Sequence, residues 1–455
     1  MVIILGNRLI LLQLADDMGQ QFRNIGSKKI SVVGLGYVGL PTALAMYDKG
    51  HNINGIDISE KVITMISEGK NPIIDATSVL IIPVNSDLWK VSMDFKGIRD
   101  SDFVIVTVPT PTNEDMSPNF GYVESAMNSV LKNINPKMRT TIILESTVSP
   151  GTTRRIVTKA AKLLNLNLGQ DFYVAYSPER VSPGEVGKSV TEVARLVGCD
   201  DKENGEEISK LYSSITSGGC KYVGTIEIAE AAKMIENVQR DLDIAFVNEL
   251  ALILPEMGLD VEAVLDAASS KWSFHRHTPG IGVGGHCIPV DPYYYIDASN
   301  KLGVPSLLGP IARKINDSMP HISSKYIIRD IGNTKNSKVL ILGYSYKPEV
   351  GDTRMTPVLE LASDLHKAGI EIFIWDPYVK ADDFPDWIVN IEDPYKIEGL
   401  DYVILATGHL KCLHLNWKKL LDNCQSNKIY DGRRLLNKIS LEEIGWNYSG
   451  VGYPK

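Results

Sequence analysis

The chain contains the same series of apolar segments twice. Residues 29–33 (KISVV) run into Gly34, and residues 338–342 (KVLIL) run into Gly343 in the same way. Two further pairs follow in the same order: 50–57 and 369–376 each lead from a glycine to an aspartate seven positions later, and 101–107 resembles 400–406. Apolar runs without alternation are typical of parallel strands buried on both faces, and the segments between them have room for crossover helices. The repeat therefore predicts two doubly wound α/β domains with parallel sheets.

A long helix is expected between the two repeats. Residues 226–257 contain no glycine and have their only proline, Pro255, near the end; apolar residues recur at helical spacing, at positions 228, 235, 242, 246, 250 and 253. At ~1.5 Å per residue such a helix is about 45 Å long. Because apolar residues lie on more than one of its faces, we expect a homodimer or higher homo-oligomer built on it. The predicted organisation is an extension (1–27), a first Rossmann-like domain (28–220), a helical middle domain (221–330) and a second Rossmann-like domain (331–455).

Length, charge and cysteine content exclude several classes of protein. The 455 residues suggest about three domains, at ~150 residues each. The formal net charge of −8 argues against a nucleic-acid binder, which needs a basic surface. The five cysteines are scattered without metal-ligand spacing, so we expect a reducing, cytoplasmic location and no metal. The apolar start of the chain is interrupted by Asn7 and Arg8, which predicts neither a membrane span nor a secretion signal.

A G-x-G-x-x-G pattern directly after the first predicted strand indicates a dinucleotide site. Its glycines are suited to a tight turn, to close approach of a pyrophosphate and to close packing of the next helix, whose N-terminus favours anions. Asp57 follows the next strand, where a carboxylate accepts from both ribose hydroxyls and repels a 2′-phosphate, so NAD is favoured over NADP. A glycine turn serving another ligand is the alternative. The predicted cofactor-binding residues here are Gly34, Gly36, Tyr37, Val38, Gly39 and Asp57.

Hydroxyl-bearing segments follow two later strands of the first domain. V-P-T-P-T at 108–112 contains Pro109 and Thr110, and E-S-T-V at 145–148 contains Thr147. The carboxyl ends of strands are where open α/β sheets bind ligands, so these residues are candidates to line the ribose and nicotinamide. Ordinary turn chemistry explains each of them equally well when taken singly.

One cysteine lies in an unusual glycine-rich segment. Residues 280–292 (GIGVGGHCIPVDP) place four glycines before Cys287, which argues against a simple helix or strand and suggests close approach to a ligand. A thiol is a nucleophile only as its thiolate, which a neighbouring cation such as Lys233 would favour, with Asn237 one helical turn away. Glu179 in S-P-E-R supplies a carboxylate after another predicted strand. The alternatives are a small buried cysteine, a solvated lysine and a turn-capping glutamate.

Ordered motifs over about residues 28–440 resemble the UDP-glucose/UDP-mannuronate (GDP-mannose) dehydrogenase family. They are G-L-G-Y-V-G-L-P at 34–41, V-P-T-P-T at 108–112, S-T-V at 146–148, S-P-E-R at 177–180, K-x-x-x-N at 233–237, N-E at 248–249, G-G-H-C-I-P-V-D-P at 284–292, Y-K-P-E-V-G-D-T-R at 346–354 and D-G-R at 431–433. The resemblance implies an enzyme that oxidises the C6 alcohol of a UDP-sugar to a carboxylate in two hydride transfers and consumes two NAD.

The resemblance also implies roles for individual residues. Cys287 looks like the nucleophile, which captures the C6 aldehyde as a thiohemiacetal that is then oxidised to a thioester. Lys233 and Asp291 resemble the pair that handles protons and stabilises an oxyanion, and Asn237 resembles a donor to the developing charge. Glu179 and Thr147 look like the residues that order the hydrolytic water.

The second α/β domain resembles the UDP-binding half of the family. Its first strand leads into Gly343, but the second and third glycines of the dinucleotide pattern are absent. Arg354 resembles a cofactor contact reached across an interface, and surface charge remains an alternative for Lys347 and Arg433. The substrate-binding residues implied by the resemblance are Glu179, Arg180, Lys233, Asn237, Gly282, Gly284, Tyr346, Lys347 and Arg433.

One position bears on the sugar. Val290 stands where members acting on UDP-glucose commonly carry a lysine, and the segment H-C-I-P-V-D-P resembles the branch that oxidises UDP-N-acetylhexosamines. We favour UDP-N-acetylmannosamine (UDP-ManNAc), followed by UDP-N-acetylglucosamine (UDP-GlcNAc). Either Lys271 or Arg276 is the basic residue that family members lend to a neighbouring subunit. The alternatives for the whole chain are a UDP-glucose 6-dehydrogenase, a two-electron hydroxy-acid dehydrogenase and a non-catalytic nucleotide-sugar binder.

Overall fold

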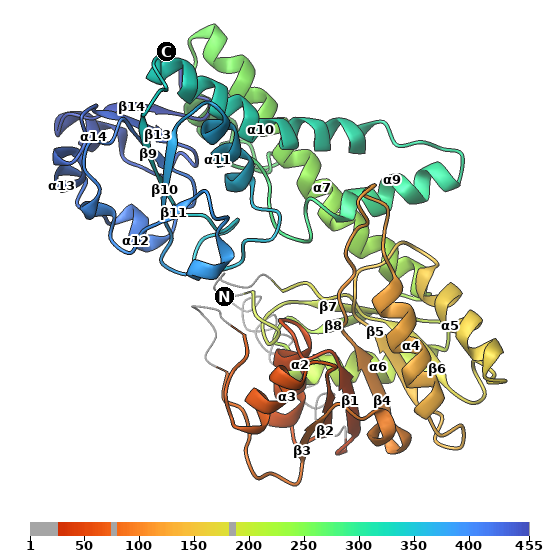
Figure 1. The fold of residues 1–455 in the computed structure, drawn as a ribbon. Coiled ribbons are helices and arrows are strands. Elements are labelled where there is room, and N and C mark those ends of the chain that lie inside the picture. The colour runs from red at the N-terminus through yellow and green to blue at the C-terminus, as the bar shows by residue number, and fades with distance from the viewer. Residues whose placement is uncertain (1–25, 74–79, 182–187, 455) are drawn as a thin grey trace, which may run out of the picture. The chain divides into compact units, whose positions relative to one another are not determined.

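The computed structural model describes residues 26–73, 80–181 and 188–454 (Figure 1). Almost all of the predicted extension 1–27 lies outside these ranges. The chain divides into two compact units within the long helix α7 (Ile226–Ile253): apart from short segments, the N-terminal unit ends at Met234 and the C-terminal unit begins at Ile235. Each unit is built around its own sheet.

The N-terminal unit contains an eight-stranded sheet in the order β3-β2-β1-β4-β5-β6-β7-β8. All neighbouring strands are parallel except β6 and β7, which are antiparallel. The strands are β1 (Lys29–Val33), β2 (Asn52–Ile56), β3 (Trp89–Ser92), β4 (Phe103–Val106), β5 (Thr141–Leu144), β6 (Tyr173–Tyr176), β7 (Arg195–Cys199) and β8 (Cys220–Tyr222).

Helices cover both faces of this sheet. On one face, Val104, Val106 and Leu144 pack with buried residues of α4 and α5. On the other, Val32 and Ile105 pack with residues of α2 and α6. Adjacent residues of a strand point to opposite faces, so strands covered on both sides need continuous apolar sequence, as the repeat predicted. The helices are α2 (Gly39–Asp48), α3 (Glu60–Ser67), α4 (Gly121–Asn133), α5 (Thr152–Leu163) and α6 (Lys202–Ile215), with the 3₁₀ helix η1 (Phe95–Asp100).

The C-terminal unit contains a six-stranded sheet, parallel throughout, in the order β11-β10-β9-β12-β13-β14. This order is the same as that of the first six strands of the N-terminal sheet, and it is the strand order of a doubly wound dinucleotide-binding fold. The predicted pair of doubly wound parallel sheets is therefore confirmed. The strands are β9 (Lys338–Leu342), β10 (Glu371–Trp375), β11 (Val389–Asn390), β12 (Tyr402–Leu405), β13 (Lys428–Asp431) and β14 (Asn447–Gly450).

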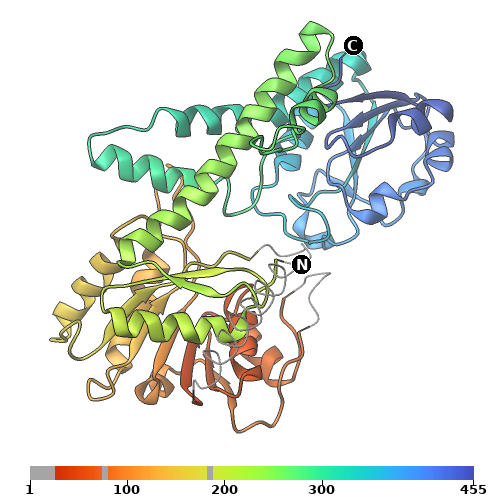
Figure 2. The ribbon, with the colours of Figure 1, turned by 180° about the vertical axis from the view of Figure 1, so that it is seen from behind.

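The C-terminal unit also contains helices, which the non-helical segment 269–290 separates into two groups along the chain. Two of them, α9 (Asp291–Lys301) and α10 (Leu308–Ile331), follow each other in the chain and contact each other (Figure 2). The others are α8 (Val261–Ala268), α11 (Pro357–Lys367), α12 (Leu410–Leu413), α13 (Trp417–Asp422) and α14 (Lys438–Glu443), with the 3₁₀ helices η2 (Leu254–Met257), η3 (Ala381–Asp383) and η4 (Pro394–Lys396).

The long helix is slightly shorter than predicted. The α-helix ends at Ile253 and continues as η2, in which Pro255 occupies one of the first positions. Proline has no N–H to donate to the preceding turn, which accounts for the change of helix type four residues before the predicted end. Along α7, Ile235, Phe246 and Ile253 are exposed, Phe246 by 53%. Some of the apolar side chains from which the helix was predicted therefore lie on the surface of the chain and not in its core.

None of the helices in the described ranges combines the length and hydrophobicity that a bilayer crossing requires. The same ranges contain no group of three or more His, Cys, Asp or Glu side chains placed to hold a metal ion.

Candidate active site

The three glycines of the loop between β1 and α2 have three different environments. Gly34 has φ +93°, a left-handed conformation that side chains disfavour. A Cβ added at Gly39 would lie 1.8 Å from the carbonyl oxygen of Gly34, so the first turn of α2 packs directly on the loop. A Cβ at Gly36 would meet nothing within 4 Å. The turn and the close packing match the roles predicted for Gly34 and Gly39, and Gly36 leaves open space for a ligand's pyrophosphate.

The carboxylate of Asp57 lies against this loop. Its Oδ2 accepts a hydrogen bond from the backbone N–H of Leu35 at 2.8 Å, and its Oδ1 accepts from the N–H of Ser59 at 2.8 Å. Asp57 is half-buried, and a carboxylate offers about four lone-pair sites, so it retains capacity for ribose hydroxyls. No side chain in the described structure caps the N-terminus of α2. The glycine loop, Asp57 and the N-terminus of α2 thus fit the anionic dinucleotide that the sequence predicted.

The loops after β4 and β5 lie at the same edge of the sheet as the glycine loop. Thr107 donates through Oγ1 to the carbonyl of Gly34 at 2.7 Å, and Ser146 donates to the carbonyl of Val108 at 2.6 Å. Thr110 and Thr147 are half-buried in these loops, and Pro109 is exposed. The candidate nicotinamide-lining residues are therefore tied to the loop that carries the glycines.

Glu179 and Lys233 influence each other within the N-terminal unit. Glu179 follows β6, is half-buried and accepts a hydrogen bond from the N–H of Val181. Burial raises the pKa of Glu179, and the positive charges of Lys233 and Arg195 oppose that rise. Lys233 is buried on α7, so the alternative of a solvated surface lysine is wrong. Arg180 donates to the carbonyl of Ala194 at 3.3 Å.

Arg195 and Glu145 form a buried ion pair next to Glu179, and neither residue was a candidate from the sequence. Arg195 donates to Glu145 at 3.0 Å, and the Tyr212 hydroxyl donates to the same carboxylate at 2.5 Å. Both charged side chains have no exposed surface, and the N–H of Glu179 is 3.5 Å from the carbonyl of Glu145. The sequence offers one signal for this pair: Arg195 begins the otherwise apolar strand β7, and arginine is rarely fully buried unless it is paired.

In the C-terminal unit, Asn237, Cys287 and Asp291 form one group. Asn237 donates through Nδ2 to Oδ2 of Asp291 at 2.5 Å. Asp291 is buried at the start of α9, and its N–H donates to the carbonyl of Cys287 at 2.8 Å. Cys287 is half-buried. The structure thus brings the amide of Asn237, on α7, to the segment that carries Cys287 and Asp291.

The glycines before Cys287 are required by the chain's own side chains. A Cβ at Gly284 would lie 2.5 Å from Cβ of Tyr346, and one at Gly280 would lie 2.7 Å from Nη1 of Arg433. Gly285 has φ +90°, and its N–H donates to the carbonyl of Arg354 at 3.0 Å. From the sequence, these glycines were expected to allow the close approach of a ligand. The structure gives a different reason for them: the cysteine loop packs on the segments that carry the candidate UDP-binding residues.

The candidate basic residues of this unit have different surroundings. Arg433 is half-buried and donates to the carbonyls of Ala406 at 2.8 Å and Gly282 at 3.4 Å; burial lowers its pKa to about 10 although Asp431 opposes the change. Arg354 pairs with Asp352 at 2.5 Å.

The segment 271–278 left two basic candidates for a role in a neighbouring subunit. Arg276 pairs with Glu262, and with Asp266 at 2.9 Å, within its own unit. Lys271 is exposed. The choice between them stays open.

A second buried network, also missed from the sequence, supports the cysteine loop. Asn248 accepts from the N–H of Gly280 at 3.0 Å and donates to Asn316 at 2.8 Å. Asn316 donates to Asp241 at 2.7 Å, which also accepts from Arg313 at 2.6 Å. Asn248 belongs to the N-E motif, to which the sequence analysis assigned no role. Its contact spans 32 residues of sequence, so only the folded chain shows it.

Substitutions at two of the dinucleotide-loop glycines should have different effects. Gly36→Ala should leave thermal unfolding unchanged but weaken NAD binding, because its methyl group would enter space that is empty of protein. Gly39→Ala should destabilise the N-terminal unit by about 1–3 kcal/mol, because the loop must move to relieve the overlap. Calorimetric NAD binding and thermal unfolding measure both effects; unweakened NAD binding by Gly36→Ala would contradict the assignment of this loop.

Comparison with known proteins agrees with these features. Three models of the UDP-glucose/GDP-mannose dehydrogenase family match in order: the NAD binding domain at residues 28–216, the central domain at 227–318 and the UDP binding domain at 340–438. A UDP-N-acetyl-D-glucosamine 6-dehydrogenase of Salmonella typhi is 35% identical over 391 residues, covering 85% of this chain and 91% of that protein. A UDP-N-acetyl-D-mannosamine dehydrogenase of Pyrococcus horikoshii is 33% identical over 433 residues, covering 93% and 99%.

Solved structures give the same result. The structure of a UDP-D-ManNAc dehydrogenase from Pyrococcus horikoshii superposes with a TM-score of 0.82 at 30% identity, covering 93% of this chain and 99% of that one. With its NAD-binding N-terminal domain, the chain belongs to the UDP-glucose/GDP-mannose dehydrogenase family and is an NAD-dependent UDP-sugar dehydrogenase.

Proposed function

We propose that this protein oxidises the C6 hydroxyl of a UDP-N-acetylhexosamine to the uronate through a cysteine-bound intermediate. The observation that carries the proposal is the group formed by Cys287, Asp291 and Asn237, packed by glycine contacts against Tyr346 and Arg433. A two-electron hydroxy-acid dehydrogenase needs no cysteine. Relatives named for action on UDP-N-acetylglucosamine and UDP-N-acetylmannosamine support the class of sugar.

The first half of the proposed reaction ends on sulfur. NAD, when bound, accepts a hydride at each of the two oxidations. The C6 alcohol loses a hydride and its hydroxyl proton, which leaves an aldehyde. The thiol of Cys287 then loses its proton, its sulfur forms a bond to C6 as the π bond of the carbonyl opens, and the carbonyl oxygen takes a proton, giving a thiohemiacetal. Lys233 and Asp291 are assigned the proton transfers, and Asn237 the hydrogen bond to the oxygen that becomes charged.

The second half releases the acid. Loss of a second hydride and a proton from the thiohemiacetal leaves a thioester, and water attacks its carbonyl carbon. The carbon–sulfur bond breaks, the uronate leaves, and the thiol of Cys287 is restored. Glu179 and Thr147 are assigned the positioning of this water; the burial that raises the pKa of Glu179 makes its carboxylate a stronger base than an exposed one.

Val290 supports the choice of sugar. It is buried immediately before Asp291, so this position supplies no ammonium group, unlike the lysine common in members that act on UDP-glucose. Loss of a long charged side chain is compatible with an acetamido group at C2. We propose UDP-ManNAc as the preferred substrate and UDP-GlcNAc as the next.

The exposed apolar residues of α7 support a homodimer or higher homo-oligomer. Ile235, Phe246 and Ile253 lie along one helix, and burial against a second copy would remove them from water. Sedimentation of the purified chain measures its assembly.

A panel of UDP-sugars tests the proposed function. With NAD, UDP-ManNAc should give the highest kcat/KM, UDP-GlcNAc the next and UDP-glucose the lowest, and NADH absorbance should rise by about two NADH per sugar. Each oxidation transfers one hydride, so a stoichiometry of one would exclude the thioester route. The highest kcat/KM on UDP-glucose would overturn the choice of sugar.

Replacing Cys287 tests the covalent step. Cys287→Ser should abolish formation of the uronate, because the weaker nucleophile does not retain the aldehyde as a hydrolysable thioester. Product analysis by mass spectrometry measures the effect, and Cys424→Ser, at another half-buried cysteine, is the matched control. Full turnover by Cys287→Ser would remove the cysteine from the mechanism.

The raised pKa of Glu179 predicts a pH dependence for thioester hydrolysis. The carboxylate form is the active one, so the hydrolysis rate should fall as the pH drops through a value above the ordinary carboxyl pKa of 4.5. Glu179→Gln should remove this acid limb and accumulate the thioester. Acid-quenched single turnovers measure both effects; an unchanged acid limb in Glu179→Gln would assign it to another group.

A further inference from the structure

The C-terminal sheet has its own counterpart of the aspartate that lies beside the dinucleotide loop. Asp376 follows β10 as Asp57 follows β2, and the loop after β9 begins at Gly343 as the first loop begins at Gly34. Asp376 differs from Asp57 because both of its carboxylate oxygens accept hydrogen bonds from the protein and its side chain is fully buried. Its Oδ2 accepts from the N–H groups of Tyr344 at 2.7 Å and Ser345 at 2.9 Å, and its side chain has no exposed surface. The hydrogen bond from His409, followed by those from the N–H groups of Ser345 and Tyr344, lowers the pKa of Asp376 to about 2 despite its burial.

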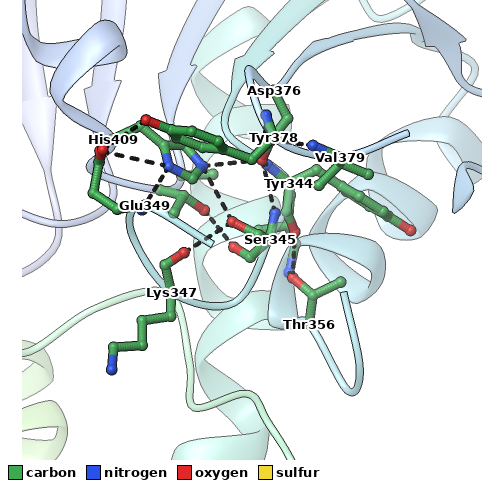
Figure 3. A network of polar contacts seen from close by, with 12 residues as sticks. Tyr344, Ser345, Lys347, Glu349, Thr356, Asp376, Tyr378, Val379 and His409 are labelled. Carbon is green, nitrogen blue, oxygen red and sulfur yellow. Dashed lines mark hydrogen bonds and ion pairs between the residues drawn. The ribbon is translucent and has the colours of Figure 1, made fainter. Parts of the chain in front are cut away.

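His409 connects Asp376 to the far end of the same loop (Figure 3). The N–H of Glu349 donates to Nδ1 of His409 at 3.0 Å, so this nitrogen must be the acceptor. The ring proton therefore lies on Nε2, which is 3.0 Å from Oδ2 of Asp376 and 3.1 Å from Oγ of Ser345. A neutral imidazole can therefore accept from Glu349 through one nitrogen and donate to Asp376 through the other. The side chain of His409 is completely buried.

The residue at the far end of the loop adopts a conformation that needs support. Glu349 has φ +62°, which is unfavourable for a residue with a side chain. Its carboxylate accepts from the hydroxyl of Tyr378 at 2.6 Å and from the N–H of Leu410 at 2.7 Å. Together with the bond from its N–H to His409, these contacts hold the backbone in that conformation.

Lys347 lies between the two anchored ends. Ser345 donates through Oγ to the carbonyl of Lys347 at 2.9 Å. The side chain of Lys347 points away from the network, as Figure 3 shows. The network thus holds the backbone that carries the lysine, and the ammonium group lies at the end of a side chain that extends away from the network.

We propose that His409 is a positioning residue for the nucleotide sugar: by bridging Asp376 and Glu349 it holds loop 345–349 in the conformation that presents Lys347 to the diphosphate. The inference rests on the proposed function, because it assigns Lys347 to the UDP portion of the substrate. His409 itself touches neither the substrate nor NAD in this proposal.

Three substitutions at His409 separate the contacts of its two ring nitrogens. His409→Ala removes both, His409→Gln can retain a donor toward Asp376, and His409→Asn can retain an acceptor for the N–H of Glu349. We expect His409→Ala to raise the KM for the UDP-sugar and the Kd for UDP by about ten-fold. The kcat and the KM for NAD should remain unchanged, and the two amide variants should show smaller effects.

A double-mutant cycle with Lys347→Ala identifies the route of the effect. If His409 acts through Lys347, His409→Ala should weaken UDP binding no further once Lys347 is alanine, because coupled residues are non-additive. His321→Ala is the matched control: His321 also pairs with an aspartate in this unit, Asp364, at 2.6 Å, but lies outside the loop. It should leave UDP binding unchanged.

The outcomes distinguish this inference from the proposed function. A wild-type protein that neither binds UDP nor oxidises a UDP-sugar would overturn the proposed function itself. An active wild type with unchanged UDP affinity in the three variants would overturn the role of His409 alone. Additive effects with Lys347→Ala, or parallel losses of UDP binding, NAD binding and thermal stability in every His409 variant, would also contradict it by showing a general structural effect.

Discussion

The close packing of the glycine segment 280–285 is the contact on which the candidate active site of the C-terminal unit depends. A Cβ at Gly284 would collide with Cβ of Tyr346, and one at Gly280 would lie 2.7 Å from the guanidinium of Arg433, so the close approach of the loop depends on the absence of side chains at these two glycines. This contact brings the residues next to Cys287 against the end of the second sheet. The thiol and the proposed UDP-binding residues Tyr346 and Arg433 thereby belong to one packed unit.

The two sheets show how one topology takes two roles. Both have the same order in their first six strands, and both place an aspartate after the second strand of the repeat. In the N-terminal sheet, Asp57 accepts two backbone hydrogen bonds and remains half-buried beside an open glycine. In the C-terminal sheet, Asp376 is sealed by backbone amides and His409. The carboxylate of Asp57 is suited to bind a ribose, whereas the equivalent carboxylate of Asp376 holds a loop of its own unit in place.

Much of this arrangement was predictable because it depends on local pattern. Continuous apolar segments predicted β1 and β9 with their observed bounds, and the predicted segment 101–107 contains β4. The glycine spacing predicted the turn at Gly34 and the packing at Gly39. The long helix was predicted to within four residues of its end, where Pro255 changes the helix type. Cys287 was a candidate because of its glycine-rich segment and Asn237 because it lies one helical turn from Lys233, whereas Asp291 was found through resemblance to a family. The contact between Asn237 and Asp291 required the structure.

The sequence by itself determined the fold class, the dinucleotide loop and the family, because each follows from spacing within short segments or from ordered motifs. The tertiary structure alone revealed the buried polar pairs Arg195–Glu145 and Asn248–Gly280 and the bridge made by His409. The physical reason is that a polar side chain is stable in the interior only when a partner meets it there. Those partners are separated by 32 to 60 residues of chain, and no local pattern records which of them meet.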